Sequence, residues 1–259
     1  MPLAFTRAVS PRLADCALTH LKRQPIDPAR AAAQHAVYER ALEDAGFTVR
    51  RLATLDEHPD GVFVEDTAIL LGSHAIITRP GVPSRFDEAF STAEGLEPFF
   101  TIHHLAEGTL DGGDVLRIDK MLYVGRSRRT DASGTTALGE AVAPLGYQVV
   151  PVELGLCLHL KTAVTFAGPD GAGLPTLLVN PEWVDPAIFA GTDPVHVAES
   201  EPSAANSVRA GSRLIVPAGN PKTAEMLRDR GFTVVEVDLS ELQKAEAGGT
   251  CMSLISDQA

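Results

Sequence analysis

The stretch "AEMLRDRGFTVVEVDL" (residues 224–239) contains the pattern that decides the fold. An amphipathic run of helical type is followed by Gly231 and then by alternating residues of strand type. Glycine is common directly after a helix, because it adopts the left-handed backbone conformation at low cost. The stretch therefore predicts a helix, a glycine cap and a strand.

Similar stretches recur at nearly even distances along the chain. Two are close copies and two are looser: "ALEDAGFTVRRL" at Gly46, "ALGEAVAPLGYQVVPVEL" at Gly146, "STAEGLEPFFTIHHL" at Gly95 and "PAIFAGTDPVHVAE" at Gly191. Successive glycines of this series are 49, 51, 45 and 40 residues apart. Such spacing is typical of a fold built from repeated units.

Four of the five units also begin with a pair of apolar runs suited to a β-hairpin. These pairs lie at residues 67–80, 112–125, 161–180 and 206–219, and the third turns at the Asp-Gly of 170 and 171. The helix expected at about 28–45 lacks such a pair, so its strands must come from the two ends of the chain, 3–10 and 251–256. We therefore expect one domain, residues 1–259, built as a closed ring of five strand-strand-helix-strand units. The alternative is an open α/β sheet with a fortuitous rhythm.

Composition limits the classes of partner. The formal net charge of −12, with no basic stripe, argues against nucleic acid and suits a cationic small-molecule substrate. Many proteins are acidic simply to stay dispersed, so charge alone does not decide this. No run approaches the ~20 apolar residues of a membrane helix, and the N-terminus lacks the order of a signal peptide. We therefore expect a soluble, cytoplasmic protein that does not bind membranes.

The three cysteines indicate neither a disulfide framework nor a structural zinc site. Cys16, Cys157 and Cys251 are odd in number, far apart and form no C-x-x-C pair. Cys251 lies in "EAGGTCMSLIS" (246–256), just before the expected ring-closing strand. From this stretch alone, it is either a buried thiol or a nucleophile carried on the strand.

One stretch offers a proton donor. As an extended strand, "LCLHLKT" (156–162) would put Cys157, His159 and Lys161 on one face. A half-buried histidine there suits proton transfer near neutral pH. Two other interpretations stay open: a hydrogen-bonded core histidine, or a Cys157–His159 metal pair whose further ligands show no spacing in the sequence.

Acidic residues gather at two places. "DGVFVEDTAIL" (60–70) carries Asp60, Glu65 and Asp66, which repel one another unless a cation such as a guanidinium lies among them. "LDGGDVL" (110–116) has acids on both sides of a Gly-Gly that permits close backbone approach. Acids in turns and at strand ends are also common without any ligand.

Two arginines lie in expected loops. Arg85 in "PSRF" and Arg129 in "SRRT" could hold a carboxylate or simply stay solvated.

Nucleotide-binding motifs are missing from the sequence. The chain contains neither G-x-x-x-x-G-K-[ST] nor a G-x-G-x-x-G between a strand and a helix. These observations favour a small charged ligand over a nucleotide.

Taken together and in this order, the segments resemble the dimethylarginine dimethylaminohydrolase family of the guanidino-group-modifying superfamily. The resemblance runs over nearly the whole chain. It is carried by "RLADCALTHL", "AQH" (33–35), "FVED" (63–66), "ITRPGVPSR" (77–85), "LDGGDVL", the Arg-Thr of "SRRT", "LHLKT" and "TCMS". It implies a five-bladed α/β propeller, in agreement with the five units counted above.

The resemblance implies hydrolysis of N-ω-methylated arginine to citrulline and methylamine or dimethylamine, with no metal or organic cofactor. Cys251 matches the nucleophile, which attacks the guanidinium carbon and gives a covalent S-alkylthiouronium. His159 matches the group that acts first as general acid and then as base. Asp111 matches the acid that orients His159, where many relatives have Glu.

Nothing in the sequence indicates an oligomeric state. The resemblance does imply which residues contact the substrate. The matching residues are Asp60, Glu65 and Asp66 near the guanidinium and amino groups, Arg85 and Arg129 at the α-carboxylate, and the backbone of Leu18 and Ala245. The loop around Ala245 differs in composition from the family pattern, so its match is the loosest.

Lys161 separates this family from its relatives. Arginine deiminases carry an acid two residues after the histidine, whereas a lysine would repel a guanidinium or point elsewhere. This favours methylated over unmethylated arginine, with the number of methyl groups left open. The chain is short for an amidinotransferase. A catalytically idle binder of arginine-like ligands would not need Cys251, His159 and Asp111 together.

Formation of the thiolate is a separate question. A thiol at the ordinary pKa of ~8.5 is only a few per cent ionised at pH 7. Either nearby cationic groups lower the pKa of Cys251, or the bound guanidinium promotes its ionisation. The sequence leaves both routes open.

Overall fold

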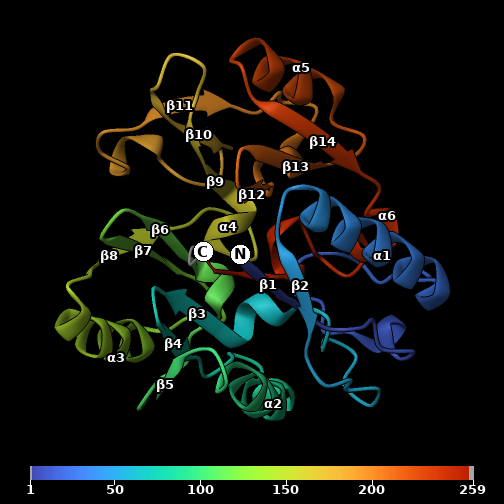
Figure 1. Cartoon of the computed structure of the whole chain (residues 1–259), viewed down its shortest axis with the longest axis vertical. Coiled ribbons are helices and arrows are strands. Elements are labelled where there is room, and N and C mark those ends of the chain that lie inside the picture. The colour runs from blue at the N-terminus through green and yellow to red at the C-terminus, as the bar shows by residue number, and fades with distance from the viewer. Residues whose placement is uncertain (1, 257–259) are drawn as a thin grey trace.

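Five small sheets form a ring in the computed structural model, which describes residues 2–256. Within this part of the chain each sheet has three strands, and the longer helices lie on the outside of the ring (Figure 1). The middle strand of each sheet pairs antiparallel with one neighbour and parallel with the other. The five-bladed α/β propeller predicted from the sequence is confirmed.

Four blades take their strands in chain order, and all four predicted hairpins are confirmed. Their strands are β3 Ala68–Leu71, β4 His74–Ile77 and β5 Thr101–His104; β6 Val115–Ile118, β7 Met121–Arg126 and β8 Gln148–Glu153; β9 Val164–Pro169, β10 Pro175–Val179 and β11 Asp193–His196; and β12 Val208–Ala210, β13 Arg213–Pro217 and β14 Thr233–Val237.

The fifth blade closes the ring with strands from both ends of the chain. β1 (Leu3–Thr6) is its middle strand and lies between β15 (Leu254–Ile255) and β2 (Thr48–Arg51). Ala4 pairs antiparallel with Ile255 and parallel with Val49. Figure 1 shows β1 near the middle of the ring, next to β2. This is the shared blade that the sequence predicts.

The helices follow the predicted order. Their bounds are α1 Pro28–Asp44, α2 Phe86–Leu96, α3 Ala132–Val142, α4 Leu160–Ala163, α5 Pro221–Asp229 and α6 Ser240–Gln243. Short 3₁₀ turns lie between them: η1 Leu13–Asp15, η2 Val64–Thr67, η3 Pro83–Arg85, η4 Gly112–Asp114, η5 Ala143–Leu145, η6 Pro186–Ile188, η7 Pro202–Ala205 and η8 Thr250–Met252. Asp27 caps α1 by accepting from two backbone N–H groups, and Gly46 follows the helix with a φ of 95°.

The two looser copies of the repeat differ from the prediction. Gly95 lies inside α2 and does not cap it; a Cβ there would lie 2.4 Å from Cδ2 of Leu52, so the helix can pack closely only on a glycine. The copy at Gly191 has no α-helix, because Asp185 and Pro186 start a single turn, η6, which ends at Ile188. The strands of the repeat are therefore present in every blade, whereas the helix and its glycine cap are not.

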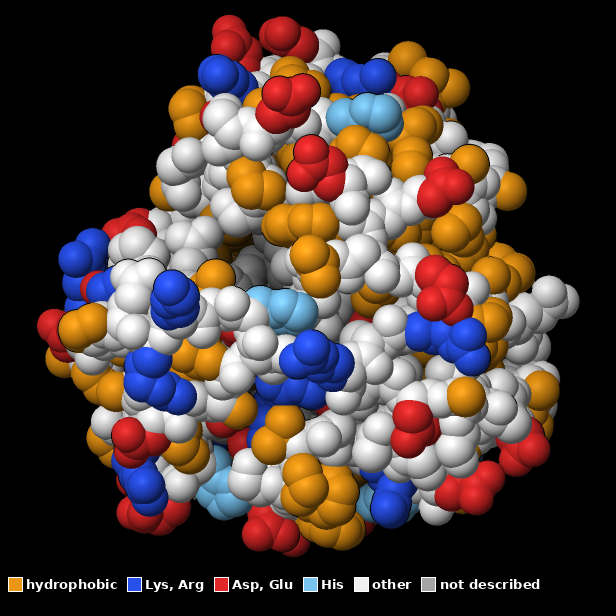
Figure 2. Space-filling model, turned by 180° about the vertical axis from the view of Figure 1, so that it is seen from behind, with side chains coloured by type: hydrophobic (Ala, Val, Ile, Leu, Met, Phe, Trp, Pro, Cys, Tyr) orange, Lys and Arg blue, Asp and Glu red, His pale blue; other side chains and the backbone are white. Residues whose placement is uncertain are grey.

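Two further features of the described residues complete the picture. Seen from behind, the molecule is hollowed near the middle of its face (Figure 2). No helix within residues 2–256 has the length and apolar character needed to cross a membrane.

Candidate active site

Five short helical turns meet around the centre of the ring, and each comes just before the first strand of a blade. They are η2, η4, α4, η7 and η8. η2 contacts η4 and η8, and α4 contacts η4 and η7. Because the turns converge, side chains far apart in the sequence come together there.

Cys251 lies in η8 and not in the strand itself, which begins at Leu254. The expectation that 251–256 is a strand is thus right only for its last part. The side chain is half-buried, and the backbone N–H of Gly248 donates to its Sγ at 3.3 Å. Cys251 is a free thiol on a tight turn beside the ring-closing strand.

The predicted extended strand at 156–162 is wrong. His159 is the N-cap of α4, and the Thr162 hydroxyl accepts from its backbone N–H at 3.3 Å. The carboxylate of Asp114 accepts from Leu160 N at 2.9 Å, which holds the start of the helix. As a result, Cys157, His159 and Lys161 do not share one face. The Sγ of Cys157 donates to the backbone oxygen of His159 at 3.5 Å, which removes it from the proposed metal pair.

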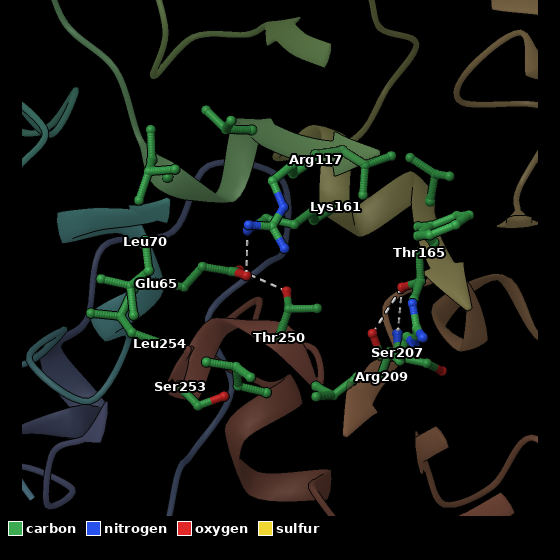
Figure 3. Close-up of a pocket in the computed structure, with 18 of the residues that line it drawn as sticks. Glu65, Leu70, Arg117, Lys161, Thr165, Ser207, Arg209, Thr250, Ser253 and Leu254 are labelled. Carbon is green, nitrogen blue, oxygen red and sulfur yellow. Dashed lines mark hydrogen bonds and ion pairs between the residues drawn. The ribbon is translucent and has the colours of Figure 1, made fainter. Parts of the chain in front are cut away.

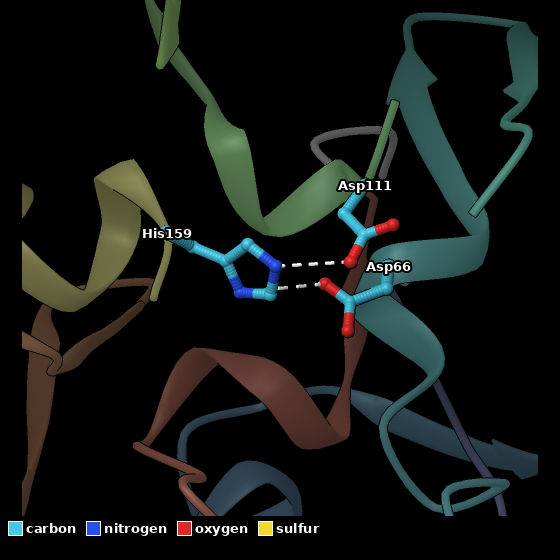
Figure 4. Close-up of side chains that lie close together, drawn as sticks. All are labelled: Asp66, Asp111 and His159. Carbon is cyan, nitrogen blue, oxygen red and sulfur yellow. Dashed lines mark hydrogen bonds and ion pairs between the residues drawn. The ribbon is translucent and has the colours of Figure 1, made fainter. Parts of the chain in front are cut away.

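His159 is buried between two carboxylates (Figure 4). Its Nε2 lies 3.0 Å from Oδ2 of Asp111, and its Nδ1 lies 3.9 Å from Oδ1 of Asp66. The predicted close approach of the Gly-Gly is confirmed, because a Cβ on Gly113 would lie 2.7 Å from both Asp66 Oδ1 and His159 Nδ1. Glycine at this position lets the three side chains meet.

The charges around His159 favour its protonated form. Burial lowers the pKa of His159, but the charges of Asp66 and Asp114 and the hydrogen bond that His159 donates to Asp111 outweigh burial and raise the pKa to about 9. Burial likewise opposes ionisation of Asp66, yet His159 and Arg85 hold its pKa below the ordinary value. At neutral pH the histidine is therefore an imidazolium that can donate a proton.

The surroundings of the Cys251 thiol disfavour its charged form. Burial, followed by the negative charges of Glu65 and Asp66, raises the pKa of Cys251 to about 12. The N–H of Gly248 and the charge of Lys161 lower the pKa, but by less. The cations already present in the protein do not offset burial, which favours the route in which a bound guanidinium promotes ionisation.

The two predicted arginines are buried near the same carboxylates. Arg85 pairs with Asp66 at 2.7 Å and with Glu88 at 2.8 Å. Arg129 donates to the hydroxyl of Thr19 at 2.8 Å and lies 3.8 Å from Oδ2 of Asp111. Arg85 therefore supplies the positive charge that the acidic cluster needs. The nearest partner of Arg129 is the neutral hydroxyl of Thr19, which binds a guanidinium less strongly than a carboxylate does.

A small cavity of about 20 Å³ joins these groups. An arginine side chain needs more room than this, so binding of such a ligand has to widen the space between the walls. Its walls include Ala17, Asp60, Phe63, Asp66, Arg85, Arg129, Leu158, His159, Ala245, Glu246, Ala247 and Cys251. Of the predicted site residues, Leu18, Glu65 and Asp111 do not line this cavity. Leu18 is half-buried against the core next to it, and Asp111 reaches the site through His159.

Glu65 faces a second cavity of about 250 Å³ (Figure 3). One oxygen of its carboxylate lies 2.5 Å from Nζ of Lys161, and the other accepts from the Thr250 hydroxyl at 2.6 Å. Burial raises the pKa of Glu65, and Lys161 acts against this rise. Lys161 thus points away from the small cavity, which is one of the two arrangements that the sequence left open. Glu65 links Lys161 to Thr250 in the turn that carries Cys251.

Asp66, Asp111 and His159 could in principle hold a metal ion, since one ligand atom from each lies within 4.8 Å of the others. The guanidinium of Arg85 lies 2.7 Å from Asp66, and that of Arg129 lies 3.8 Å from Asp111. Two positive charges beside the cluster oppose a further cation. The carboxylates are better matched to the arginines and the imidazolium than to a metal.

Relatives of known name share most of the chain. It is 41% identical over 255 residues to the N(G),N(G)-dimethylarginine dimethylaminohydrolase of Streptomyces coelicolor, covering 97% of this chain and 95% of that protein. It is 35% identical over 231 residues to the enzyme of the same name from Pseudomonas aeruginosa, covering 88% and 89%. The chain belongs to the dimethylarginine dimethylaminohydrolase family. No family model matches it.

Solved structures agree with this membership of the dimethylarginine dimethylaminohydrolase family. A mutant of the Pseudomonas aeruginosa enzyme complexed with citrulline has a TM-score of 0.91 at 33% identity, covering 98% of both chains. A dimethylarginine dimethylaminohydrolase adduct with S-methyl-L-thiocitrulline has a TM-score of 0.90 at 32% identity, covering 99% of this chain and 100% of that one. A cyanobacterial arginine dihydrolase domain has a TM-score of 0.81 at 20% identity, which shows a shared fold alone.

Two residues of this dimethylarginine dimethylaminohydrolase family member were missed at the sequence level. The carboxylate of Glu246 accepts backbone N–H groups of Thr19, His20 and Leu21 at 2.8, 2.5 and 2.5 Å, which holds the loop over the small cavity. Asn206, in the turn before β12, contacts the turn of Cys251. Neither stands in a recognisable motif, and only the fold brings each to its partner.

Proposed function

We propose that the protein hydrolyses N-ω-methylated arginine to citrulline and methylamine or dimethylamine, with Cys251 as the nucleophile. The observation that carries the proposal is the convergence of a free thiol with a buried imidazolium–carboxylate pair on one cavity. The family relationship at 41% identity supports the choice of reaction.

The cavity suits a substrate with a cationic head and a carboxylate tail. Asp60 and Asp66 supply negative charge for the guanidinium, with Glu65 behind them, and Leu158 and Phe63 supply apolar surface for methyl groups. Arg129 can exchange its contact with the neutral Thr19 hydroxyl for the stronger one with a carboxylate. Arg85 acts more by charge, since its donors are already bound to Asp66, Glu88 and backbone oxygens. The backbone of Leu18 and Ala245 completes the set.

In the first half-reaction the thiolate of Cys251 attacks the guanidinium carbon and a tetrahedral adduct forms. The imidazolium of His159 gives its proton to the methylated nitrogen, and the bond from that nitrogen to the carbon breaks. The neutral amine leaves, and the carbon stays bound to sulfur as an S-alkylthiouronium. Asp111 keeps the ring of His159 oriented and stabilises its charge before the transfer.

In the second half-reaction the neutral imidazole takes a proton from water, and the resulting hydroxide equivalent attacks the thiouronium carbon. The carbon–sulfur bond then breaks, which returns the thiolate and releases citrulline. As the carbonyl of citrulline forms, the proton of the added hydroxyl is released to solvent, where the amine takes up a proton. Over both halves one guanidinium and one water therefore give citrulline and one ammonium ion, which balances atoms and charge. No step calls for a metal or an organic cofactor.

We infer further that residues 1–259 act as one catalytic domain in the cytoplasm. A blade shared between both ends of the chain supports a single unit, and three free thiols fit a reducing compartment. The net charge of −12 supports a cationic small-molecule substrate rather than nucleic acid.

Incubation with asymmetric dimethylarginine, monomethylarginine and arginine tests the function, with citrulline and the released amine as readouts. We expect citrulline from a methylated substrate at a higher kcat/KM than from arginine. The absence of citrulline from any methylarginine would refute the proposal, and faster turnover of arginine would indicate a deiminase.

Two matched cysteine variants test the nucleophile. Cys251→Ser should abolish turnover, while Cys157→Ser should largely preserve it, because the Cys157 thiol is buried against the backbone of His159 outside the small cavity. The reverse pattern would exchange the two assignments.

A further inference from the structure

Each of the five turns at the centre of the ring carries a polar side chain at an equivalent position in or beside the site. The side chain on one turn has no role in the chemistry above. Asp66, Asp111, His159 and Cys251 lie in or next to η2, η4, α4 and η8. Asn206 ends η7, the fifth turn. Successive members of the series are 45, 48, 47 and 45 residues apart, the rhythm of the blades themselves.

We propose that Asn206 stabilises the thiolate of Cys251 through its side-chain amide and fixes the turn that carries this nucleophile. This proposal rests on the proposed function, since that function assigns Cys251 as the attacking group. It concerns the free enzyme, so its test needs no turnover.

Hydrogen bonds set the orientation of the Asn206 amide. Its Oδ1 accepts from the backbone N–H of Thr250 at 2.9 Å, and its backbone oxygen accepts from the N–H of Gly249 at 3.0 Å. A backbone N–H can only donate, so the amide oxygen must face Thr250. Nδ2 then points to Sγ of Cys251, at 3.9 Å. The contact is long for a neutral thiol, and a thiolate would attract the N–H more strongly.

The approach of the two turns is close. A Cβ on Gly248 would lie 2.1 Å from Cγ of Asn206, so only glycine fits beside the amide. The N–H of Gly248 also donates to Sγ, at 3.3 Å. Two neutral N–H donors thus face the sulfur, and Asn206 is only 4% exposed, so water does not compete for its amide.

A neutral donor suits this place better than a cation. The sulfur interacts electrostatically with Glu65 and Asp66 in η2, with Lys161 in α4 and with Tyr38 in α1. The cavity that it lines also holds charged or titratable groups of Asp60, Arg85, Arg129, His159 and Glu246. The carboxylates of Glu65 and Asp66 oppose ionisation of Cys251. An added lysine or arginine would offset them but would also repel a guanidinium, whereas an amide stabilises the thiolate without repelling the substrate.

Alkylation of Cys251 by iodoacetamide at pH 8.5 measures the thiolate directly, with the modified peptide identified by mass spectrometry. Asn206→Asp keeps the acceptor for Thr250 but turns a carboxylate oxygen towards sulfur. We expect the rate constant to fall at least about tenfold in this variant, which corresponds to about one pKa unit, and to fall less in Asn206→Ala. Asn180→Asp, which also alters a buried asparagine, should alkylate at the wild-type rate.

The direction of the change separates the proposal from a purely structural role. A turn that is merely loosened exposes its thiol and is alkylated faster. Unchanged or faster alkylation of Asn206→Asp would therefore overturn the proposal. Slower alkylation supports it even where no methylarginine is hydrolysed, so failure of the proposed function remains distinguishable.

A measurement on the wild-type chain covers the case in which both variants fail to fold. In ¹⁵N-labelled protein at a fixed pH, the side-chain amide resonances of Asn206 should differ between wild type and Cys251→Ala, because Nδ2 of Asn206 faces the sulfur. The resonances of Asn180 should be the same in both proteins. Asn206 amide resonances that are the same with and without the thiol would refute the contact.

Discussion

The Nε2 atom of His159 lies 3.0 Å from Oδ2 of Asp111, and both side chains are buried. The shorter aspartate still reaches the ring because its other oxygen, Oδ1, accepts from the N–H of Gly81 at 2.7 Å and so fixes the carboxylate. The aspartate carboxylate is thus held at hydrogen-bond distance from the imidazole.

Asp111→Asn tests this pair. Removing the carboxylate should lower the pKa of His159 and weaken its orientation, so kcat/KM should fall about 10- to 100-fold. The loss of activity on the alkaline side should also begin at a lower pH. A pH–rate profile measures both effects, and Asp119→Asn in the exposed β6–β7 turn is the control. A variant with reduced activity but an unshifted profile would show that Asp111 does not set the protonation of His159.

The raised pKa of His159 also predicts how stability depends on pH. The folded value is about 9, above the ~6.5 of an unfolded chain, so the folded state holds its proton more tightly. The stabilisation is fully present below pH ~6.5 and is lost as pH rises through about 9. Urea unfolding of wild type and His159→Gln should therefore give a difference in free energy of unfolding that shrinks from pH 6 to pH 10. A difference that grows over this range would contradict the raised pKa.

The ring could be predicted from sequence because its signals are local. A glycine after a helix, a hairpin turn and a run of alternating apolar residues each leave a pattern within about 15 residues. The helix predicted before Gly191 is absent, because the local sequence of Asp185 and Pro186 starts only a single 3₁₀ turn. The closing blade followed by elimination, because the first helix lacked a hairpin of its own.

The site could be predicted only in part, because its contacts cross between blades. The strand expected at 156–162 was overridden by Asp114, which binds the N–H of Leu160 from 46 residues away. The partner of Lys161 likewise lies 96 residues earlier, at Glu65. Such pairs leave no pattern within a short stretch of sequence. The direction in which these side chains point could therefore be determined only from the fold.

The Lys161–Glu65 pair should contribute to stability. Lys161 is 18% exposed and Glu65 is 7% exposed, so removing one partner leaves a charge in a poorly solvated place. Lys161→Met should cost about 3 kcal/mol in free energy of unfolding, measured by urea denaturation. The double variant with Glu65→Gln should recover part of that loss, because no unpaired carboxylate remains. Additive losses in the double variant would show that the two side chains act independently.

Glu246 should control access to the site. It is a non-glycine residue with a φ of 61°, a strained conformation that points its carboxylate at three backbone N–H groups of residues 19–21. Glu246→Ala should free this loop, raise KM about 3- to 10-fold and change kcat less, because substrate binding has to order the loop. Cleavage by trypsin after Lys22 or Arg23 should also become faster. Glu140→Ala, on the exposed face of α3, is the matched control. If Glu246→Ala keeps the wild-type KM and the wild-type rate of cleavage, the carboxylate of Glu246 does not restrain the loop of residues 19–21.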